Sequence, residues 1–158
     1  MELPPLTEKI VALLDGAGVP YRFVEHDATR TSEESAAARG EPLEIGGKSL
    51  LLKVGPHFAL CVLSASARVD ANAVRRHLGQ SGARFATREE LHELTGLVPG
   101  CVPPFGEPIL ALPLLLDEGF LANDRIAFNA ASLHHSVIMN TEDWLRIARP
   151  QLGRFARP

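Results

Sequence analysis

The sequence predicts a mixed α/β fold of the α+β kind, formed as a single domain over residues 1–158. A length of 158 residues suits one domain with a substantial hydrophobic core, and 46% apolar with 22% charged residues is typical of a folded protein. Helix and strand patterns alternate irregularly, and hairpin-like strands gather late in the chain. The dinucleotide-binding pattern GxGxxG is absent, which disfavours a doubly wound fold.

The first half of the chain alternates between helix and strand patterns. Apolar residues three or four positions apart predict a helix over 6–14, and alternation of apolar and polar residues predicts a strand over 21–25. The Thr-Ser pair at 31–32 can cap a short, alanine-rich helix. The apolar segments 46–55 and 58–64 predict two strands joined by a tight Gly-Pro turn.

The second half begins with two capped helices and ends in closely spaced strands. Asp70 is expected to cap one helix, and Thr87 with Glu90 forms a capping box for the next. A final helix is expected to be capped by Thr141 and ended by Pro150. Strands are expected over 83–86, 109–116, 119–121, 125–129 and 136–139.

Composition excludes several classes of protein. A net charge of −3 argues against a broadly basic nucleic-acid binder. Two local groups of arginines, at 75–76 and after Asp143, can still contact phosphates, and the alternative for the second group is a solvated basic tail. No apolar run approaches the roughly twenty residues that span a bilayer, and no secretory signal is recognisable, so a cytoplasmic location is expected. Two cysteines without a CxxC motif predict neither a disulfide framework nor structural zinc, and no cofactor is expected.

The segment 96–106, Gly-Leu-Val-Pro-Gly-Cys-Val-Pro-Pro-Phe-Gly, is expected to form a stiff loop. Its three glycines and three prolines cannot form a helix or the middle of a sheet. Its apolar side chains predict that it packs against the body of the protein. Free N–H groups in such a loop can bind an oxyanion, and the alternative is an ordinary packed turn. We refer to this segment as the Gly/Pro loop.

Lys48 lies at the start of the apolar segment 46–55. Period-two alternation places it on the same face as Leu50 and Leu52. A lysine there either reaches solvent or occupies a pocket, where its ammonium can hold a carbonyl, a phosphate or an attacking water. The segment is not a phosphate-binding P-loop, because position 43 is leucine where GxxxxGK[ST] requires glycine.

The histidines give no metal signature. His134 and His135 are neighbours at the start of a late strand, where successive side chains point to opposite faces. At most one of them is expected to enter a given pocket, so joint metal binding is disfavoured. A Ser-His-Asp triad stays open because Ser132 and Ser136 flank the pair, but no GxSxG elbow supports it.

Three motifs, in this order, resemble those of the YbaK/EbsC superfamily of prolyl-tRNA-synthetase-associated editing domains. They are Thr31-Ser-Glu-Glu34, Gly47-Lys-Ser-Leu50 and Gly96-x-x-Pro-Gly-x-Val-x-Pro-Phe-Gly106, with Asn129 and Ser132 near a late strand. The resemblance covers essentially the full chain. It implies a compact fold around a mixed, barrel-like sheet surrounded by helices, with a pocket between the lysine strand and the Gly/Pro loop.

Members of this superfamily hydrolyse the ester of mischarged aminoacyl-tRNA, mostly a wrong small amino acid on tRNA for proline. The resemblance implies a freestanding, trans-acting deacylase whose partner is the aminoacyl-tRNA acceptor end, with prolyl-tRNA synthetase as a second candidate partner. An activated ester needs only a positioned water and a stabilised oxyanion, which fits the absence of a triad or zinc site. The alternatives are a catalytically silent tRNA- or protein-binding module on the same scaffold and a small-molecule ester hydrolase.

The resemblance also implies which residues form the site. Lys48 matches the family lysine that contacts the aminoacyl-tRNA end and supports hydrolysis. Backbone N–H groups near Gly100 and Cys101 are expected to hold the oxyanion, and Cys101 as a nucleophile is an alternative hypothesis. His135 resembles a histidine that serine/threonine-type relatives carry before a late strand. The expected substrate-binding residues are Gly96, Pro99, Phe105, Gly106, Ser132, His135 and Leu63.

Overall fold

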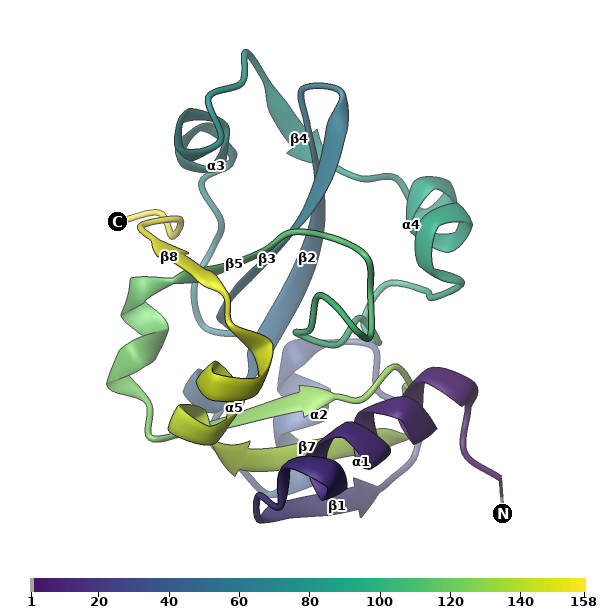
Figure 1. Cartoon of the computed structure of the whole chain (residues 1–158). Coiled ribbons are helices and arrows are strands. Elements are labelled where there is room, and N and C mark those ends of the chain that lie inside the picture. The colour runs from purple at the N-terminus through teal and green to yellow at the C-terminus, as the bar shows by residue number, and fades with distance from the viewer. Residues whose placement is uncertain (1) are drawn as a thin grey trace.

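Two β-sheets with helices around them make up the protein, seen in a computed structural model that describes residues 2–158 (Figure 1). The helices are α1 (Pro5–Ala17), α2 (Ser32–Arg39), α3 (Ala71–His77), α4 (Arg88–Thr95) and α5 (Thr141–Ala148), with 3-10 turns η1 (Leu43–Ile45) and η2 (Glu118–Ala122). The strands are β1 (Tyr21–Glu25), β2 (Gly47–Val54), β3 (His57–Ser64), β4 (Ala83–Phe85), β5 (Leu114–Asp117), β6 (Arg125–Asn129), β7 (His135–Asn140) and β8 (Gln151–Gly153). Within the described residues, no helix combines the length and apolar character needed to cross a membrane.

The two sheets meet at one corner. The smaller sheet has the order β1-β7-β6 and is antiparallel, whereas the larger has the order β4-β2-β3-β5-β8 and mixes antiparallel with parallel pairs. A bridge between Gly46 and Ala127 joins them just before β2 begins. The mixed α/β class predicted from the sequence is confirmed. The barrel-like closure is not: among residues 2–158 the strands remain in two separate sheets.

Helices α1 and α2 cover opposite faces of the smaller sheet (Figure 1). Successive residues of β7 point to opposite faces, so Val137 packs in the main core with Ile10 of α1, while Ser136 bonds Arg39 of α2. In α2, the Thr31 side chain accepts a hydrogen bond from Glu34 N–H, as the capping motif predicts. The polar face of β7 is therefore available to build a site beneath α2.

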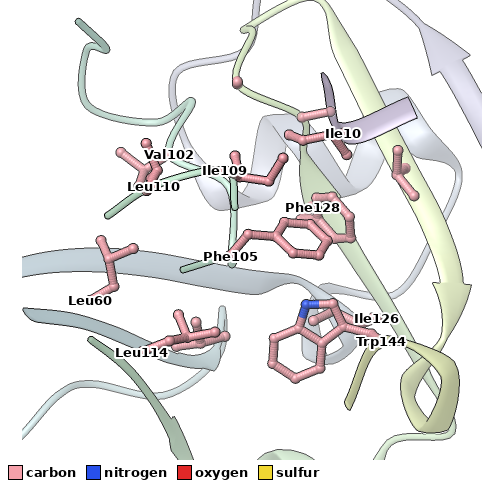
Figure 2. Packing of buried hydrophobic residues seen from close by; sticks show 14 of the residues in the cluster. Ile10, Leu60, Val102, Phe105, Ile109, Leu110, Leu114, Ile126, Phe128 and Trp144 are labelled. Carbon is pink, nitrogen blue, oxygen red and sulfur yellow. The ribbon is translucent and has the colours of Figure 1, made fainter. Parts of the chain in front are cut away.

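The main core lies between the smaller sheet, the Gly/Pro loop and α5 (Figure 2). Phe105 of the loop is buried edge-on against Phe128, with ring centroids 5.5 Å apart. Trp144 of α5 is fully buried, and its Nε1–H donates to the Pro104 carbonyl at 3.0 Å. The Gly/Pro loop is thus a packed part of the body, as its apolar residues predict.

Most elements of the first 95 residues form where the local signals place them. Asp70 caps α3 by accepting hydrogen bonds from Asn72 and Ala73 N–H, and Thr87 with Glu90 forms the full capping box of α4. β2 and β3 pair as an antiparallel hairpin through the tight turn expected at Gly55. Local chemistry alone therefore determines these boundaries.

Several later elements differ from the prediction. The strand expected over 109–116 is only Leu114–Asp117, because Ile109 and Leu110 N–H both bond the Gly106 carbonyl in a tight turn. The strand expected over 119–121 is the 3-10 turn η2, whose first turn is closed by the Asp117 side chain accepting from Gly119 N–H. Asn140 takes the N-cap place expected for Thr141, and β8 has no counterpart in the prediction.

Candidate active site

A hollow of about 170 Å³ opens at the corner where the two sheets meet. Its walls come from α2 and the two residues before it, from the start of β2, from the residue after β3, from β6 and from the Gly/Pro loop. It is lined by Arg30, Thr31, Ser32, Ser35, Arg39, Gly46, Gly47, Lys48, Ser49, Leu50, Ala65, Gly100, Val102, Ala127 and Asn129. We call this space the polar hollow.

Lys48 lines the polar hollow from the second residue of β2, opposite Leu63 of β3. Its Nζ donates a hydrogen bond to the Ala67 carbonyl. Partial burial, and secondarily the charge of Arg68, lowers the pKa of the Lys48 ammonium below its usual value. The ammonium is therefore partly stripped of water and directed by a backbone carbonyl, which suits a group that donates to a bound oxygen.

The Thr31-Ser32 motif brings hydroxyl groups to the same space. Thr31 is the N-cap of α2, and Ser32 and Ser35 lie in its first two turns along the wall of the hollow. Ser35 Oγ donates to Thr29 Oγ1 at 2.9 Å, which fixes its orientation. These groups give one side of the hollow neutral donors and acceptors.

Arg39 ends α2 and is 7% exposed. Its Nε–H donates to Ser136 Oγ at 2.9 Å and its Nη2–H to Asn129 Oδ1 at 3.1 Å. Asn129 in turn donates through Nδ2 to the Gly100 carbonyl at 2.6 Å. Burial lowers the pKa of Arg39 to about 10. A continuous hydrogen-bond chain thus runs from α2 through the end of β6 to the Gly/Pro loop.

Gly100 brings the Gly/Pro loop to the polar hollow. It adopts φ 95°, in the left-handed region that favours glycine, and a Cβ there would lie 3.4 Å from Leu133 Cδ2. Its N–H makes no hydrogen bond within residues 2–158. Gly100 thus brings an N–H without a hydrogen bond to the lining of the hollow, as an oxyanion site requires.

Cys101 does not line the hollow. Its N–H bonds the Val98 carbonyl at 3.3 Å, and its thiol, 4% exposed, donates to the same carbonyl. Burial raises the pKa of the thiol, which disfavours the reactive thiolate. In this structure the Cys101 N–H closes a turn, and its side chain packs in the main core.

The other expected site residues fall into two groups. Pro99 lines an adjoining hollow of about 130 Å³, which shares Ser49, Leu50, Gly100 and Val102 with the polar hollow. Gly96 is the left-handed C-cap of α4, and Leu63, Phe105 and Gly106 lie in or under the cores. This second group lines neither hollow.

Ser132 and His135 form a pair of their own at the turn between β6 and β7. His135 Nδ1 and Ser132 Oγ are 2.8 Å apart, and the imidazole stacks on Phe23 with centroids 5.5 Å apart. Neither residue lines the polar hollow, although Ser136, next in the chain, bonds Arg39. The pair stabilises the turn that carries the hydrogen-bond chain.

Sequence reasoning missed Arg30, Arg39 and Ser49. A signal for Arg39 was present, because Ser35 and Arg39 are four residues apart on a capped helix and so share one face. Asn129 entered through the resemblance alone. Within residues 2–158, no three His, Cys, Asp or Glu side chains gather as a set of metal ligands.

Comparisons of the sequence with known proteins agree with one another. A family model described as an aminoacyl-tRNA editing domain matches residues 26–147. The multifunctional Ser/Thr-tRNA deacylase ProXp-y of Escherichia coli K12 is 39% identical over 158 residues, covering 95% of this chain and 92% of that protein. The prolyl-tRNA editing protein ProX of Acetoanaerobium sticklandii is 23% identical, covering 94% of this chain and 93% of that protein.

A solved structure has the same fold. It is described as a candidate trans-editing enzyme for prolyl tRNA synthetase, and it matches with a TM-score of 0.84 at 29% identity, covering 99% of this chain and 100% of that one. The matched segment 26–147 contains every residue that lines the polar hollow and the whole Gly/Pro loop. The chain belongs to the aminoacyl-tRNA editing domain family.

Proposed function

We propose that this protein is a trans-acting aminoacyl-tRNA deacylase that removes a small hydroxylated amino acid, serine or threonine, from mischarged tRNA. Membership of the editing-domain family supports the reaction, and the Ser/Thr-tRNA deacylase at 39% identity supports the amino acids. The observation that carries the proposal is that Lys48 and Gly100 line one small hollow, and that the Gly100 N–H makes no hydrogen bond within the described residues.

The chemistry needs no protein nucleophile. Water attacks the ester carbonyl, the carbonyl oxygen gains negative charge, and the terminal ribose oxygen leaves with a proton. The Lys48 ammonium and the Gly100 N–H are the donors for the developing oxyanion. Loss of one such donor in other acyl-transfer enzymes costs about 10²–10³ in kcat. An aminoacyl ester is activated enough for this electrostatic stabilisation, together with positioning, to suffice.

Selection of the amino acid rests on size and on hydroxyl recognition. The adjoining hollow of about 130 Å³ takes only a small side chain. Ser49 Oγ is buried without a hydrogen-bond partner within the described residues, and Ser49 lines both hollows. A rotation of the Ser49 side chain toward the hollow would let a substrate hydroxyl satisfy this group, and a site that hydrogen-bonds a hydroxyl discriminates strongly against substrates that lack it.

The test is single-turnover deacylation by wild type and by Lys48→Ala. The tRNAs for serine, threonine and proline are each charged with serine, threonine, alanine and proline. We expect the wild type to clear seryl and threonyl esters selectively, and Lys48→Ala to be at least about a hundredfold slower. Prolyl-tRNA synthetase is added in a parallel series, because it was expected as a partner.

Lys53→Ala is the matched control. Lys53 lies on the same strand, but it lines neither hollow and sits with its Nζ 5.9 Å from the Phe58 ring centroid. It should retain full activity. Salt-sensitive tRNA binding without turnover of any ester would instead identify a binding module. Hydrolysis restricted to alanyl esters would refute the proposal that the site recognises the side-chain hydroxyl of the amino acid.

A further inference from the structure

The polar hollow is cationic although the protein is acidic overall. Arg30, Arg39 and Lys48 line it, and no Asp or Glu does. The whole chain carries a net charge of −3. A small concave site lined by one sign of charge focuses the field and attracts the opposite sign. The hollow is therefore built for an anion.

The positive charge of Arg39 does not stabilise the fold in an evident way. It is 7% exposed, yet no carboxylate lies within salt-bridge distance of it among residues 2–158. Glu41 raises its pKa only at a distance, because that carboxylate is occupied by Arg22 and Arg125 at 2.7 and 2.8 Å. A buried cation without a paired anion is costly, so a ligand that supplies the anion would relieve the cost.

The guanidinium of Arg39 is held in a fixed orientation and has a donor to spare. Its Nε and Nη2 are bonded to the neutral acceptors Ser136 and Asn129. Its Nη1 makes no hydrogen bond within the described residues and lies 3.7 Å from where a Cβ on Gly46 would be. Gly46 lines the hollow, so this free donor is at its wall. A fixed, planar donor group is the arrangement with which arginine recognises phosphate.

We infer that the polar hollow binds a phosphate group, the one that precedes the terminal nucleoside of the charged RNA, through Arg39 with Arg30 nearby, while Lys48, next to Ser49 in the chain, is left for the ester. This inference rests on the proposed function. It divides the substrate between the two hollows: the phosphate lies in the polar hollow, and the aminoacyl side chain lies in the adjoining one. The shared rim at Ser49 and Gly100 then holds the ester.

The charged residues of the two hollows agree with placing the phosphate in the polar hollow and the aminoacyl side chain in the adjoining one. Three cations beside the α-ammonium of an aminoacyl group would repel it, whereas they would attract a phosphodiester. The adjoining hollow is walled mainly by apolar side chains, among them Leu51, Leu91 and Val102, with Arg88 as its single charged residue. The polar hollow is thus the better place for phosphate and the adjoining hollow for a small side chain.

The first experiment measures binding alone. Titration calorimetry with adenosine and with adenosine 5′-monophosphate is run on wild type, Arg39→Gln, Arg39→Lys and the control Arg76→Gln, whose arginine is exposed on α3. We expect the monophosphate to bind wild type at least tenfold more tightly than adenosine. Arg39→Gln should abolish this preference, Arg39→Lys should retain part of it, and Arg76→Gln should leave it intact. Equal affinities for both ligands in wild type would overturn the inference.

The second experiment measures turnover with minimal substrates. Seryl adenosine is compared with the same ester bearing a 5′-phosphate, and the ratio of the two kcat/KM values should fall at least tenfold in Arg39→Gln. An unchanged ratio in that variant would show that Arg39 is only structural. Because Arg39 also braces Asn129, Arg30→Gln at the exposed rim is measured too, and it should lower the ratio without loss of folding.

Inorganic phosphate distinguishes the source of the anion. It should inhibit seryl adenosine hydrolysis by wild type more weakly than adenosine 5′-monophosphate does. Equal inhibition by the two would mean a free-phosphate site and would refute the nucleotide assignment. If wild type hydrolyses no ester, the proposed function fails. The calorimetric comparison of adenosine 5′-monophosphate with adenosine would still show whether the polar hollow binds phosphate.

Discussion

Ser136 shows how single side chains join distant parts of this chain at the site. Its hydroxyl accepts from Arg39, donates to Asn129 at 3.0 Å and lies 2.8 Å from His26 Nε2. The partners are 97, 7 and 110 residues away in the sequence. Two of these bonds fix the orientation of residues that line the polar hollow, Arg39 and Asn129. The precision of the site is therefore set residue by residue.

His135 makes the stability of this region sensitive to acid. Burial lowers the pKa of His135 below its ordinary value of 6.5, because Nε2 is buried without a partner. As the pH falls below about 6.5, the unfolded chain binds a proton that the folded chain resists. The free energy of unfolding should therefore be highest above pH 6.5, where His135 is neutral in both states, and should decrease below that pH.

Denaturant unfolding of wild type and His135→Gln between pH 7.5 and 5.5 tests this expectation. The wild type should lose stability as the pH falls through this range, and the variant should show a flatter profile. The carboxylates with lowered pKa, Glu41 and Glu90, act at lower pH because the ordinary value of both is 4.5. Parallel profiles for the two proteins would contradict the assignment to His135.

At the scale of elements, α4 places one wall of the adjoining hollow. Thr87, Arg88 and Leu91 of this helix and its cap line that hollow, and the helix ends at Gly96, where the Gly/Pro loop begins. The capping box fixes the start of α4, since Thr87 Oγ1 accepts from Glu90 N–H at 3.1 Å. The position of the loop thus depends on a cap of two residues.

Thr87→Ala should lower the free energy of unfolding by about 1 kcal/mol, the usual cost of losing an N-cap hydroxyl. Thr87→Ser keeps a capping oxygen and should stay close to wild type. Chemical denaturation followed by circular dichroism measures both. A loss of equal size in the serine variant would show that packing of the threonine methyl group, not capping, stabilises the helix start.

The sequence could predict the elements that depend on contacts between neighbouring residues, but not those that depend on contacts between distant ones. Caps and glycine-bounded strands such as Thr87–Glu90 and β2 depend on neighbouring residues, so their patterns were sufficient. β8 depends on parallel pairing with β5, and the Asp117 carboxylate that accepts from Phe155 and Ala156 N–H acts over 38 and 39 residues. No local pattern records such a contact.

The site follows the same rule. Lys48 and Gly100 belong to compact motifs, and they do line the polar hollow. Arg39 has its acceptors 97 and 90 residues away, so nothing near it in the sequence shows that it is buried. Cys101 is a candidate nucleophile by its place in the Gly/Pro loop, but only the structure shows that its thiol donates to the Val98 carbonyl and is buried.

At the scale of the whole molecule, Trp144 ties the Gly/Pro loop to α5 and the smaller sheet. Replacing it by phenylalanine leaves the buried Pro104 carbonyl without its donor and removes side-chain volume. We expect Trp144→Phe to lower the free energy of unfolding by about 2 kcal/mol or more. Because Trp144 is the only tryptophan, unfolding should be followed by circular dichroism.

Phe120→Leu is the control for this expectation. Phe120 is fully buried in the same core and lies outside the Gly/Pro loop. Both variants should be less stable, but only Trp144→Phe should also slow deacylation under conditions where each is fully folded, because it loosens the loop at Gly100. Equal rates for the two folded variants would mean that the bond to Pro104 does not hold the loop in place.

The order in which these contacts can form has a consequence for synthesis. β1 and Arg39 leave the ribosome early, whereas the β6 and β7 residues that they pair with are made some ninety or more residues later. Contacts of such long range form only after a large loop has closed, and synthesis proceeds at about 5–20 residues per second. A nascent chain therefore carries Lys48 and Gly100 for several seconds without the wall that Arg39 and Asn129 complete. Under our proposals, the enzyme would begin to edit only after β6 and β7 have been made and have paired with the earlier segments.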